Sequence, residues 1–210
     1  MSRKHVVLAA LLALVVGAAA VFFVLPSGHH TAVAQSTPPA PASTTSIDTA
    51  YFSLPVPAGW MVRERFSAKG VRQFQLGSTK APINALGIGP GGTVAVTITE
   101  YTPAVLAKGH IAGKPAESFS AIALLPFIVG QPGNAEGVQT GEQATPTTLD
   151  GAEAGEEAFF YGYNGRANLQ VDVLAKHAAR LFLIELDAEP HLQATSKSAL
   201  AQILGGWRFR

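Results

Sequence analysis

The order of hydrophobic and polar positions divides this chain into one long apolar segment followed by shorter patterned ones. Val6 to Leu25 is a run of twenty residues without a charged or strongly polar side chain. Residues 71–76 instead alternate apolar and polar at period two, which predicts a strand with one face in water. Other apolar or β-branched runs predict further strands, within 51–60 and at 61–65, 93–99, 158–163, 169–174 and 181–186.

The apolar run has the properties of a membrane-spanning helix. Twenty residues that rise about 1.5 Å each would cross the roughly 30 Å hydrocarbon core of a bilayer. Arg3 and Lys4 precede the run, and the next Lys or Arg is Arg63. Because positive residues stay on the cytoplasmic side, this pattern places the N-terminus in the cytoplasm and the bulk of the protein outside.

Two interpretations of this segment remain, an uncleaved signal anchor and a cleaved signal peptide. The run exceeds the roughly 7–15 apolar residues usual in a signal peptide, which favours the anchor. The sequence Ala32-Val33-Ala34 before Gln35 resembles a cleavage site, which favours removal. We expect the anchor, and secretion after cleavage near Ala34 is the alternative.

The residues after the run are typical of a tether. Residues 31–49 are mainly Ser, Thr, Pro, Ala and Gln, with one acidic residue, Asp48, and no Lys or Arg. Such a segment buries too little apolar surface to offset the entropy of ordering it. We therefore divide the chain into a signal anchor at 1–27, a tether at 28–47 and an extracytoplasmic domain at 48–210.

The clearest helix of the domain is predicted near the C-terminus. Asp187 or Glu189 can cap its start, and Pro190 suits its first turn. Gly205-Gly206 stops it, and four apolar residues share one face: Leu192, Leu200, Ile203 and Leu204. Residues 207–210 then alternate as a closing edge strand.

The middle of the domain is less regular. A second helix is expected within 115–125 and is ended by Pro126, whereas 131–148 is interpreted as a loop. Residues 175–180 are expected to form a hairpin turn. Because hairpins link most strands, the predicted fold class is α+β, a mainly antiparallel sheet with packed helices.

Composition excludes several kinds of chemistry. The chain of 210 residues has no cysteine, which excludes disulfides, thiolate metal sites, Cys nucleophiles and a lipid-modified N-terminal cysteine. A net charge of +1 offers no basic surface for nucleic acid. Once Arg3 and Lys4 are set aside, only 13 basic and 14 acidic residues remain, and this sparse charge suggests work near a membrane or against a partner surface.

Two patterns of catalytic or nucleotide-binding sites can be weighed directly. Residues 87–92 match G-x-G-x-x-G, but a strand is predicted after them and Pro90 removes one amide donor, so we interpret them as a glycine-rich hairpin loop. His110, His177 and His191 are dispersed, and a Ser/His/Asp triad would need distant residues to converge. We predict no catalytic, cofactor-binding or metal-binding residue.

Three further features favour structural roles. Trp60 and Trp207 are expected to be packing anchors rather than a ligand platform. The apolar run 121–129 is expected in the core, although it would be the best partner-docking candidate if it were exposed. The densest group of acids lacks a calcium-loop pattern and suits a solvated turn: Asp150, Glu153, Glu156 and Glu157.

Several short features together resemble the PsbP/Mog-like family of α/β-sandwich domains, found in photosystem extrinsic subunits, a Ran-binding protein and bacterial exported proteins. They are the entry from Phe52 to Trp60, residues 149–154 leading into a strand, the closing hairpin and helix, and residues 206–209. The resemblance covers most of 48–210, and 103–148 departs from it. It implies a sheet covered by helices and a non-catalytic binding or assembly role, and it carries over no catalytic residue.

The resulting functional hypothesis is a membrane-anchored extracytoplasmic binding or assembly module that is not an enzyme. Its expected partners are the membrane, through the N-terminal helix, and an envelope protein, with no nucleic acid and no cofactor. An extracytoplasmic enzyme such as an envelope hydrolase is one alternative. A small-ligand carrier with a pocket between sheet and helix is the other.

Overall fold

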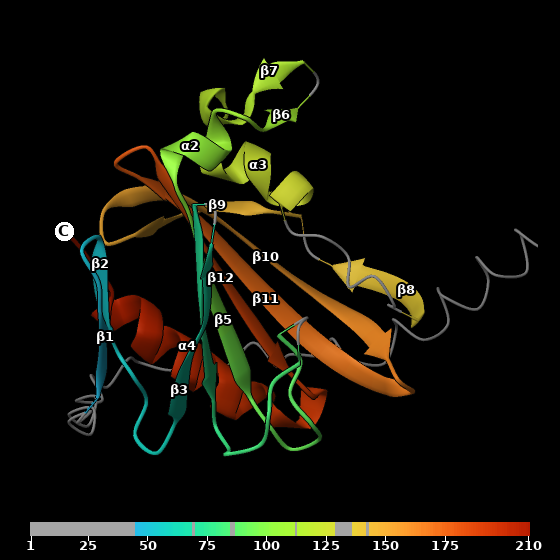
Figure 1. Ribbon diagram of the computed structural model, residues 1–210. Helices are drawn as coiled ribbons and strands as arrows, with labels where there is room; N and C mark the ends of the chain where they lie inside the picture. Colours follow the sequence, from blue (N-terminus) through green and yellow to red (C-terminus); the bar gives the residue numbers. More distant parts are fainter. Residues whose placement is uncertain (1–44, 69, 85–86, 112, 129–135, 142) are drawn as a thin grey trace, which may run out of the picture. The chain divides into compact units, whose positions relative to one another are not determined.

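The computed structural model describes residues 45–210, except 69, 85–86, 112, 129–135 and 142 (Figure 1). The predicted anchor, the cleavage site near Ala34 and most of the predicted tether lie outside these residues. Within the described part, no helix is long and apolar enough to cross a membrane.

An eight-stranded antiparallel sheet forms the centre of the domain (Figure 1). Its strand order is β3-β4-β5-β12-β11-β10-β8, and β9 also pairs with β10. This agrees with the predicted α+β class. The strands are β3 (Met61–Ala68), β4 (Val71–Gly77), β5 (Ala95–Tyr101), β8 (Glu136–Gly141), β9 (Thr145–Leu149), β10 (Ala152–Tyr163), β11 (Arg166–His177) and β12 (Arg180–Ala188).

Two-residue turns join the longest strands. Asn164 and Gly165 connect β10 to β11, and Ala178 and Ala179 connect β11 to β12, all four with positive φ. Turns of this kind match the twist of the strands they join. The turn predicted at 175–180 is shorter than expected. Strands β11 and β12 pair as far as His177 and Arg180, which leaves only residues 178–179 in the turn.

One face of the sheet is covered by helix α4 (Gln193–Gly206) and by a small sheet of β1 (Ser46–Asp48), β2 (Phe52–Pro55) and β13 (Arg208–Phe209). A 3₁₀ turn, η3 (Pro190–Leu192), precedes α4. Trp207 is fully buried, and its ring stacks on Phe52 with centroids 4.4 Å apart. Trp60 packs partly buried on the same core. The predicted packing role of both tryptophans is confirmed.

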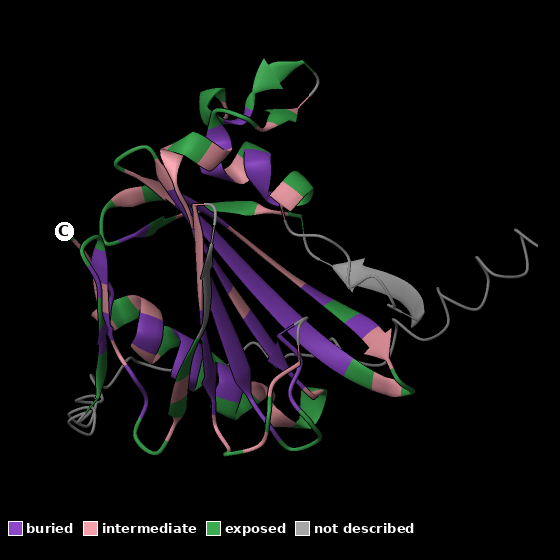
Figure 2. Cartoon of the chain, in the orientation of Figure 1, coloured by how far each residue is buried: buried purple, intermediate pink, exposed green. Residues whose placement is uncertain are grey.

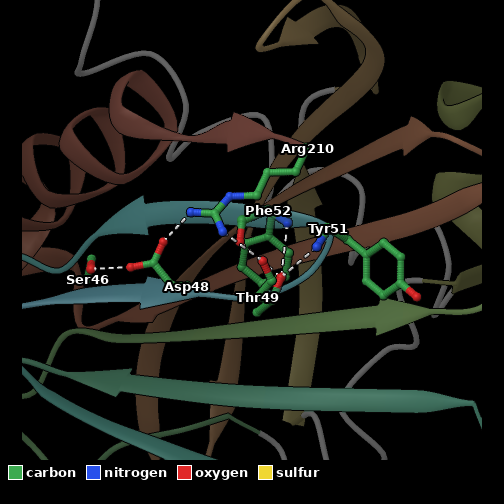
Figure 3. A network of polar contacts seen from close by, with 6 residues as sticks. All are labelled: Ser46, Asp48, Thr49, Tyr51, Phe52 and Arg210. Carbon is green, nitrogen blue, oxygen red and sulfur yellow. Dashed lines mark hydrogen bonds and ion pairs between the residues drawn. The ribbon is translucent and has the colours of Figure 1, made fainter.

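The end of the chain is tied to the first strand by a polar network (Figure 3). The Arg210 guanidinium donates to the Asp48 carboxylate at 2.5 Å and to the Thr49 carbonyl at 3.2 Å. The Thr49 hydroxyl accepts hydrogen bonds from the backbone N–H groups of Tyr51 and Phe52 and so shapes the turn between β1 and β2. The closing strand therefore pairs within the small sheet, beside β2.

The second face of the large sheet is covered at one end by a helical cap (Figure 1). Leu124 and Leu125 of α3 pack with Leu174, Leu181 and Leu183 of the sheet. The cap consists of α2 (Pro103–Leu106), the hairpin of β6 (His110–Ile111) and β7 (Lys114–Pro115), the 3₁₀ turn η2 (Ala116–Ser118), and α3 (Ala121–Ile128).

The expected helix within 115–125 is wrong in its bounds. Helix α3 begins at Ala121, where the Ser120 hydroxyl and the Glu153 carboxylate accept its first N–H groups, and it continues through Pro126 to Ile128. Pro126 lacks the N–H that would reach the Ile122 carbonyl, and its ring crowds that carbonyl, which disfavours a longer helix; α3 ends two residues later, at Ile128.

Two other expectations are corrected by long-range pairing. The predicted loop at 131–148 contains β8 and most of β9, which both pair with β10. The predicted caps of the last helix do not act as caps, because α4 has no side-chain cap bond. Asp187 lies within β12, and Glu189 accepts from the Gly92 N–H and from Arg166.

Candidate functional site

The central strands of the large sheet are buried on both faces (Figure 2). In β11, eight consecutive residues from Asn168 to Ala175 are buried, and they alternate between apolar and polar side chains up to Asp172. One face supplies the apolar core. The other face therefore buries polar side chains, and this corrects the expectation that the alternating strand at 71–76 has a wet face, since Gln75 is buried.

Strand register places five polar residues side by side on that second face. Gln75 of β4 lies opposite Thr97 of β5, which lies opposite Glu185 of β12. Glu185 lies opposite Asp172 of β11, which lies opposite Glu157 of β10. Directly opposite residues of antiparallel strands project from the same face and contact each other. We call Gln75, Thr97, Glu185, Asp172 and Glu157 the polar row.

The residues next to the polar row hold its carboxylates in place. The Gln170 amide donates to both oxygens of Asp172, at 3.0 and 2.9 Å. In the neighbouring register position, the Tyr161 hydroxyl donates a short hydrogen bond to Asp187. These hydrogen bonds hold Asp172 within the row and Asp187 beside it.

Burial changes the acidity of these groups. It raises the pKa of Glu185 to about 7 and, against the opposing effects of the Tyr161 hydrogen bond and Arg166, raises the pKa of Asp187 to about 6. The pKa of Asp172 is raised well above its usual value by burial and by the nearby charge of Glu185. Burial also raises the pKa of Glu157. Glu185 and Asp187 therefore change protonation near neutral pH.

The connection between β4 and β5 covers the Gln75 and Thr97 end of the row. The Gln75 amide donates to the Asn84 carbonyl at 3.0 Å, and the Asn84 amide reaches the Tyr163 hydroxyl at 3.4 Å. Gly87 sits so close to Thr97 that a Cβ on it would lie 2.8 Å from the Thr97 hydroxyl oxygen. Its φ of +82° also suits glycine. We call the described residues of this connection, 78–84 and 87–94, the covering loop.

Two polar atoms beneath this cover have no hydrogen-bond partner within the described part of the chain. They are the Thr97 hydroxyl oxygen and the Asn168 amide nitrogen, on residues that are 3% and 2% exposed. Leaving a buried polar group unpaired costs about 1–3 kcal/mol. The face therefore offers unused hydrogen-bonding capacity beside buried carboxyls.

The chemistry of the row suits binding of hydrogen-bond donors or of a cation. It does not suit a metal ion, since the described residues contain no group of three or more side chains placed to hold one. Sequence inspection missed the row. Its signal was the polar alternation at 168, 170 and 172, which alone cannot show that the polar face is covered.

The three histidines considered as triad members lie on different elements. His177 stacks on Phe209 with centroids 4.2 Å apart, and His191 is exposed beside the Glu189 carboxylate at 3.5 Å. His110 is exposed in β6. In the described part of the chain, no hydrogen bond joins any of them to a serine hydroxyl, so the structure does not assemble the triad that the hydrolase alternative requires.

The predicted acidic group separates in the structure. The Asp150 carboxylate accepts from the Phe209 N–H at 2.7 Å, Glu153 accepts from the first N–H of α3, and Glu157 belongs to the polar row. Residues 87–92 lie between β4 and β5 with a strand after them, as expected of a loop rather than a nucleotide site.

The apolar run at 121–129 divides between core and surface as far as it is described. Ala121, Leu124 and Leu125 are fully buried, whereas Phe127 is 63% exposed. Expected burial is therefore confirmed for one side of α3 only.

No protein-family model matches this sequence, and no curated protein matches it either. Solved structures resemble its fold. The PsbP protein CyanoP of the cyanobacterium Synechocystis is 11% identical, and the match covers 84% of this chain and 99% of that one with a TM-score of 0.50.

Two other similar structures align less well. LpqN of Mycobacterium tuberculosis, described as involved in cell envelope biogenesis, is 19% identical over 79% of this chain and 89% of its own, with a TM-score of 0.46. The Ran-binding protein Mog1p of Saccharomyces cerevisiae is 9% identical over 78% and 94%, with a TM-score of 0.44. The antiparallel sheet with helices on both faces, together with the CyanoP match, gives this chain a PsbP/Mog-like α+β fold.

Proposed function

We propose that this protein is a non-catalytic binding module, held outside the cytoplasmic membrane by its N-terminal segment. The observation that carries the proposal is the polar row, a line of carboxyl, amide and hydroxyl groups on one face of the sheet, in which Gln75, Thr97 and Asp172 are buried. Binding sites typically combine an apolar frame with a few placed polar groups. The sparse charge and the apolar run at 6–25 support the location.

Two observations favour binding over catalysis. The carboxyl of Asp172 is engaged by Gln170, and that of Asp187 by Tyr161. A general base must reach the proton that it removes, and a nucleophile must lie beside its base. Among the described residues, the row itself contains carboxyls, amides and one threonine, and it brings no histidine or serine beside them.

The test is a thermal-unfolding screen of the full chain in detergent against small envelope components, run beside assays with ester, peptide and glycoside substrates. At least one compound should raise the unfolding temperature of the native chain, because a ligand that binds only the folded state stabilises it. The shift should disappear in Asp172→Asn and persist in Glu64→Gln, which alters an exposed acid outside the row. Turnover that Asp172→Asn abolishes would contradict the proposal.

The membrane attachment is tested separately. We expect the chain to require detergent for extraction and to retain its original N-terminus. A mature protein that begins at Gln35 would replace the anchor by a cleaved signal peptide and leave the binding function untouched.

A further inference from the structure

The charges that face the polar row are strongly unbalanced. Glu157, Asp172 and Glu185 form no ion pair with a lysine, arginine or histidine in the described part of the chain. Arg63 lies at the outer end of the row, opposite Gln75, but it is exposed and donates to the Lys80 carbonyl. Arg166 lowers the pKa of Asp187 but bonds to Glu189.

The other elements around the row add no compensating cation. Tyr101 of β5 and Tyr161 and Tyr163 of β10 carry hydroxyls, and Lys80 of the covering loop is exposed. Lys176 of β11 projects from the same face as Asp172, but its ammonium group donates to the Glu117 and Phe119 carbonyls. Residues 129–142, which include β8 at the edge beside β10, contain two glutamates and no Lys, Arg or His. A buried carboxylate without a cationic partner is costly, so the row either holds protons or takes a cation from outside.

The neighbouring groups favour an organic cation over a metal ion. The Thr97 hydroxyl oxygen, beside Glu185 and under Gly87, is free to accept an N–H from a ligand. Phe159 and Tyr161 follow Glu157 on the same face of β10, with ring centroids 6.2 Å apart. Aromatic faces attract organic cations, and their edges pack against the attached carbon chain.

We propose that the polar row binds a small organic ammonium ion, whose N–H groups bond to Glu185, Asp172 and the Thr97 hydroxyl while its carbon chain packs on Phe159 and Tyr161. This inference rests on the proposed binding function and gives that function a ligand class. In the structure the covering loop packs on Gln75 and Thr97, so a ligand that reaches the Thr97 hydroxyl must displace Gly87.

Binding of such a cation is coupled to proton release. The ammonium ion favours the ionised carboxylates, and Glu185 is partly protonated near pH 7. A protonated amine therefore displaces protons from the row, and its affinity rises as the pH rises toward about 8. A neutral ligand of the same shape gains nothing from this exchange.

The test is titration calorimetry of the full chain in detergent with 1,4-diaminobutane, and with 1,4-butanediol as the neutral probe of the same length. We expect the diamine to bind at least tenfold more tightly than the diol, with an apparent enthalpy that depends on the ionisation enthalpy of the buffer. Glu185→Gln should weaken binding of the diamine at least tenfold, and Thr97→Val should weaken it at least fivefold. Glu64→Gln should leave it unchanged.

Each contrary result identifies what is wrong. Equal binding of diol and diamine overturns the ammonium class but keeps a binding module. If Glu185→Gln binds the diamine with unchanged affinity, the diamine does not bind at the polar row. No binding of the diamine, when the screen described above yields another ligand that depends on Asp172, overturns the ammonium class alone, whereas failure of both overturns the proposed function too. Circular dichroism and the unfolding temperature of each unliganded variant show that it is folded.

Discussion

At the scale of single residues, Arg180 shows how burial changes the effect of an ion pair. Its guanidinium contacts the Glu100 carboxylate at 2.7 Å and lies 3.4 Å from the centre of the Tyr51 ring. Arg72 makes the same two kinds of contact, with Glu64 at 2.8 Å and with the Phe74 ring. The two pairs differ mainly in exposure, since the Glu100 side chain is 4% exposed and that of Glu64 is 46% exposed.

We expect Arg180→Gln to destabilise the domain by about 3–5 kcal/mol, because it leaves the Glu100 carboxylate buried without a partner. Arg72→Gln should cost at most about 1 kcal/mol, because water solvates Glu64. Urea unfolding of both variants at neutral pH measures the difference. Similar losses in the two variants would show that the burial of Glu100 does not decide the effect.

The polar row is also a residue-scale feature that only register reveals. Thr97 and Glu185 are 88 positions apart, yet β5 and β12 place them directly opposite each other. The sequence shows each as a polar position in an apolar strand. It does not show which of them are neighbours, because pairing between distant strands determines that.

At the scale of elements, the junction between α4 and β2 depends on a glycine. A Cβ on Gly206 would overlap the Cγ and Cδ atoms of Pro55, a rigid ring in β2. The adjacent Gly205 has open space around its Cβ position. The sequence analysis interpreted both glycines as a helix stop, whereas the structure gives only Gly206 a packing role.

These neighbours provide a matched pair of variants. Gly206→Ala should destabilise the domain by about 1–3 kcal/mol, because the overlap forces α4 away from β2. Gly205→Ala should be neutral or stabilising by up to about 1 kcal/mol, since alanine favours the helix. Thermal unfolding distinguishes them. If both substitutions changed the free energy of unfolding by the same amount in the same direction, the contact with Pro55 would not limit the packing of α4.

At the scale of the whole molecule, the buried carboxyls give stability an unusual dependence on pH. Their pKa values are raised in the folded state, so between about pH 4 and 7 the folded chain binds more protons than the unfolded chain. The stability that these carboxyls contribute is fully present below their pKa values in the unfolded chain. It is lost as the pH rises through their pKa values in the folded chain. Most proteins lose stability toward acid instead.

We therefore expect the unliganded chain to be more stable near pH 5 than near pH 8, by on the order of 2–3 kcal/mol for Glu185 alone. Urea unfolding at the two pH values measures this difference. Glu185→Gln removes one of the ionising groups and should reduce the difference by that group's own share, on the order of 2–3 kcal/mol, whereas Glu64→Gln should retain it. A native chain that is more stable near pH 8 would contradict the burial of unpaired carboxyls.

Much of the element pattern was predictable from local sequence. The alternation at 71–76 and the hydrophobic runs at 169–174 and 181–186 predicted strands that are present as β4, β11 and β12. The C-terminal helix was predicted from the spacing of Leu200 and Ile203, which are both buried. Strand ends and the segment 131–148 were not predictable, because pairing with β10 defines them rather than local preference.

By itself the sequence determined the apolar segment at 6–25, the α+β class and the resemblance to the PsbP/Mog-like fold, because periodicity and composition are local properties of the chain. Tertiary structure alone decided that the polar face of the sheet is buried. Strand register brings Glu185 beside Asp172, and Gly87 of the covering loop packs against Thr97 in the same row. An alternating strand has the same sequence whether water or a loop covers its polar side, so only the packed chain distinguishes a wet face from a covered one.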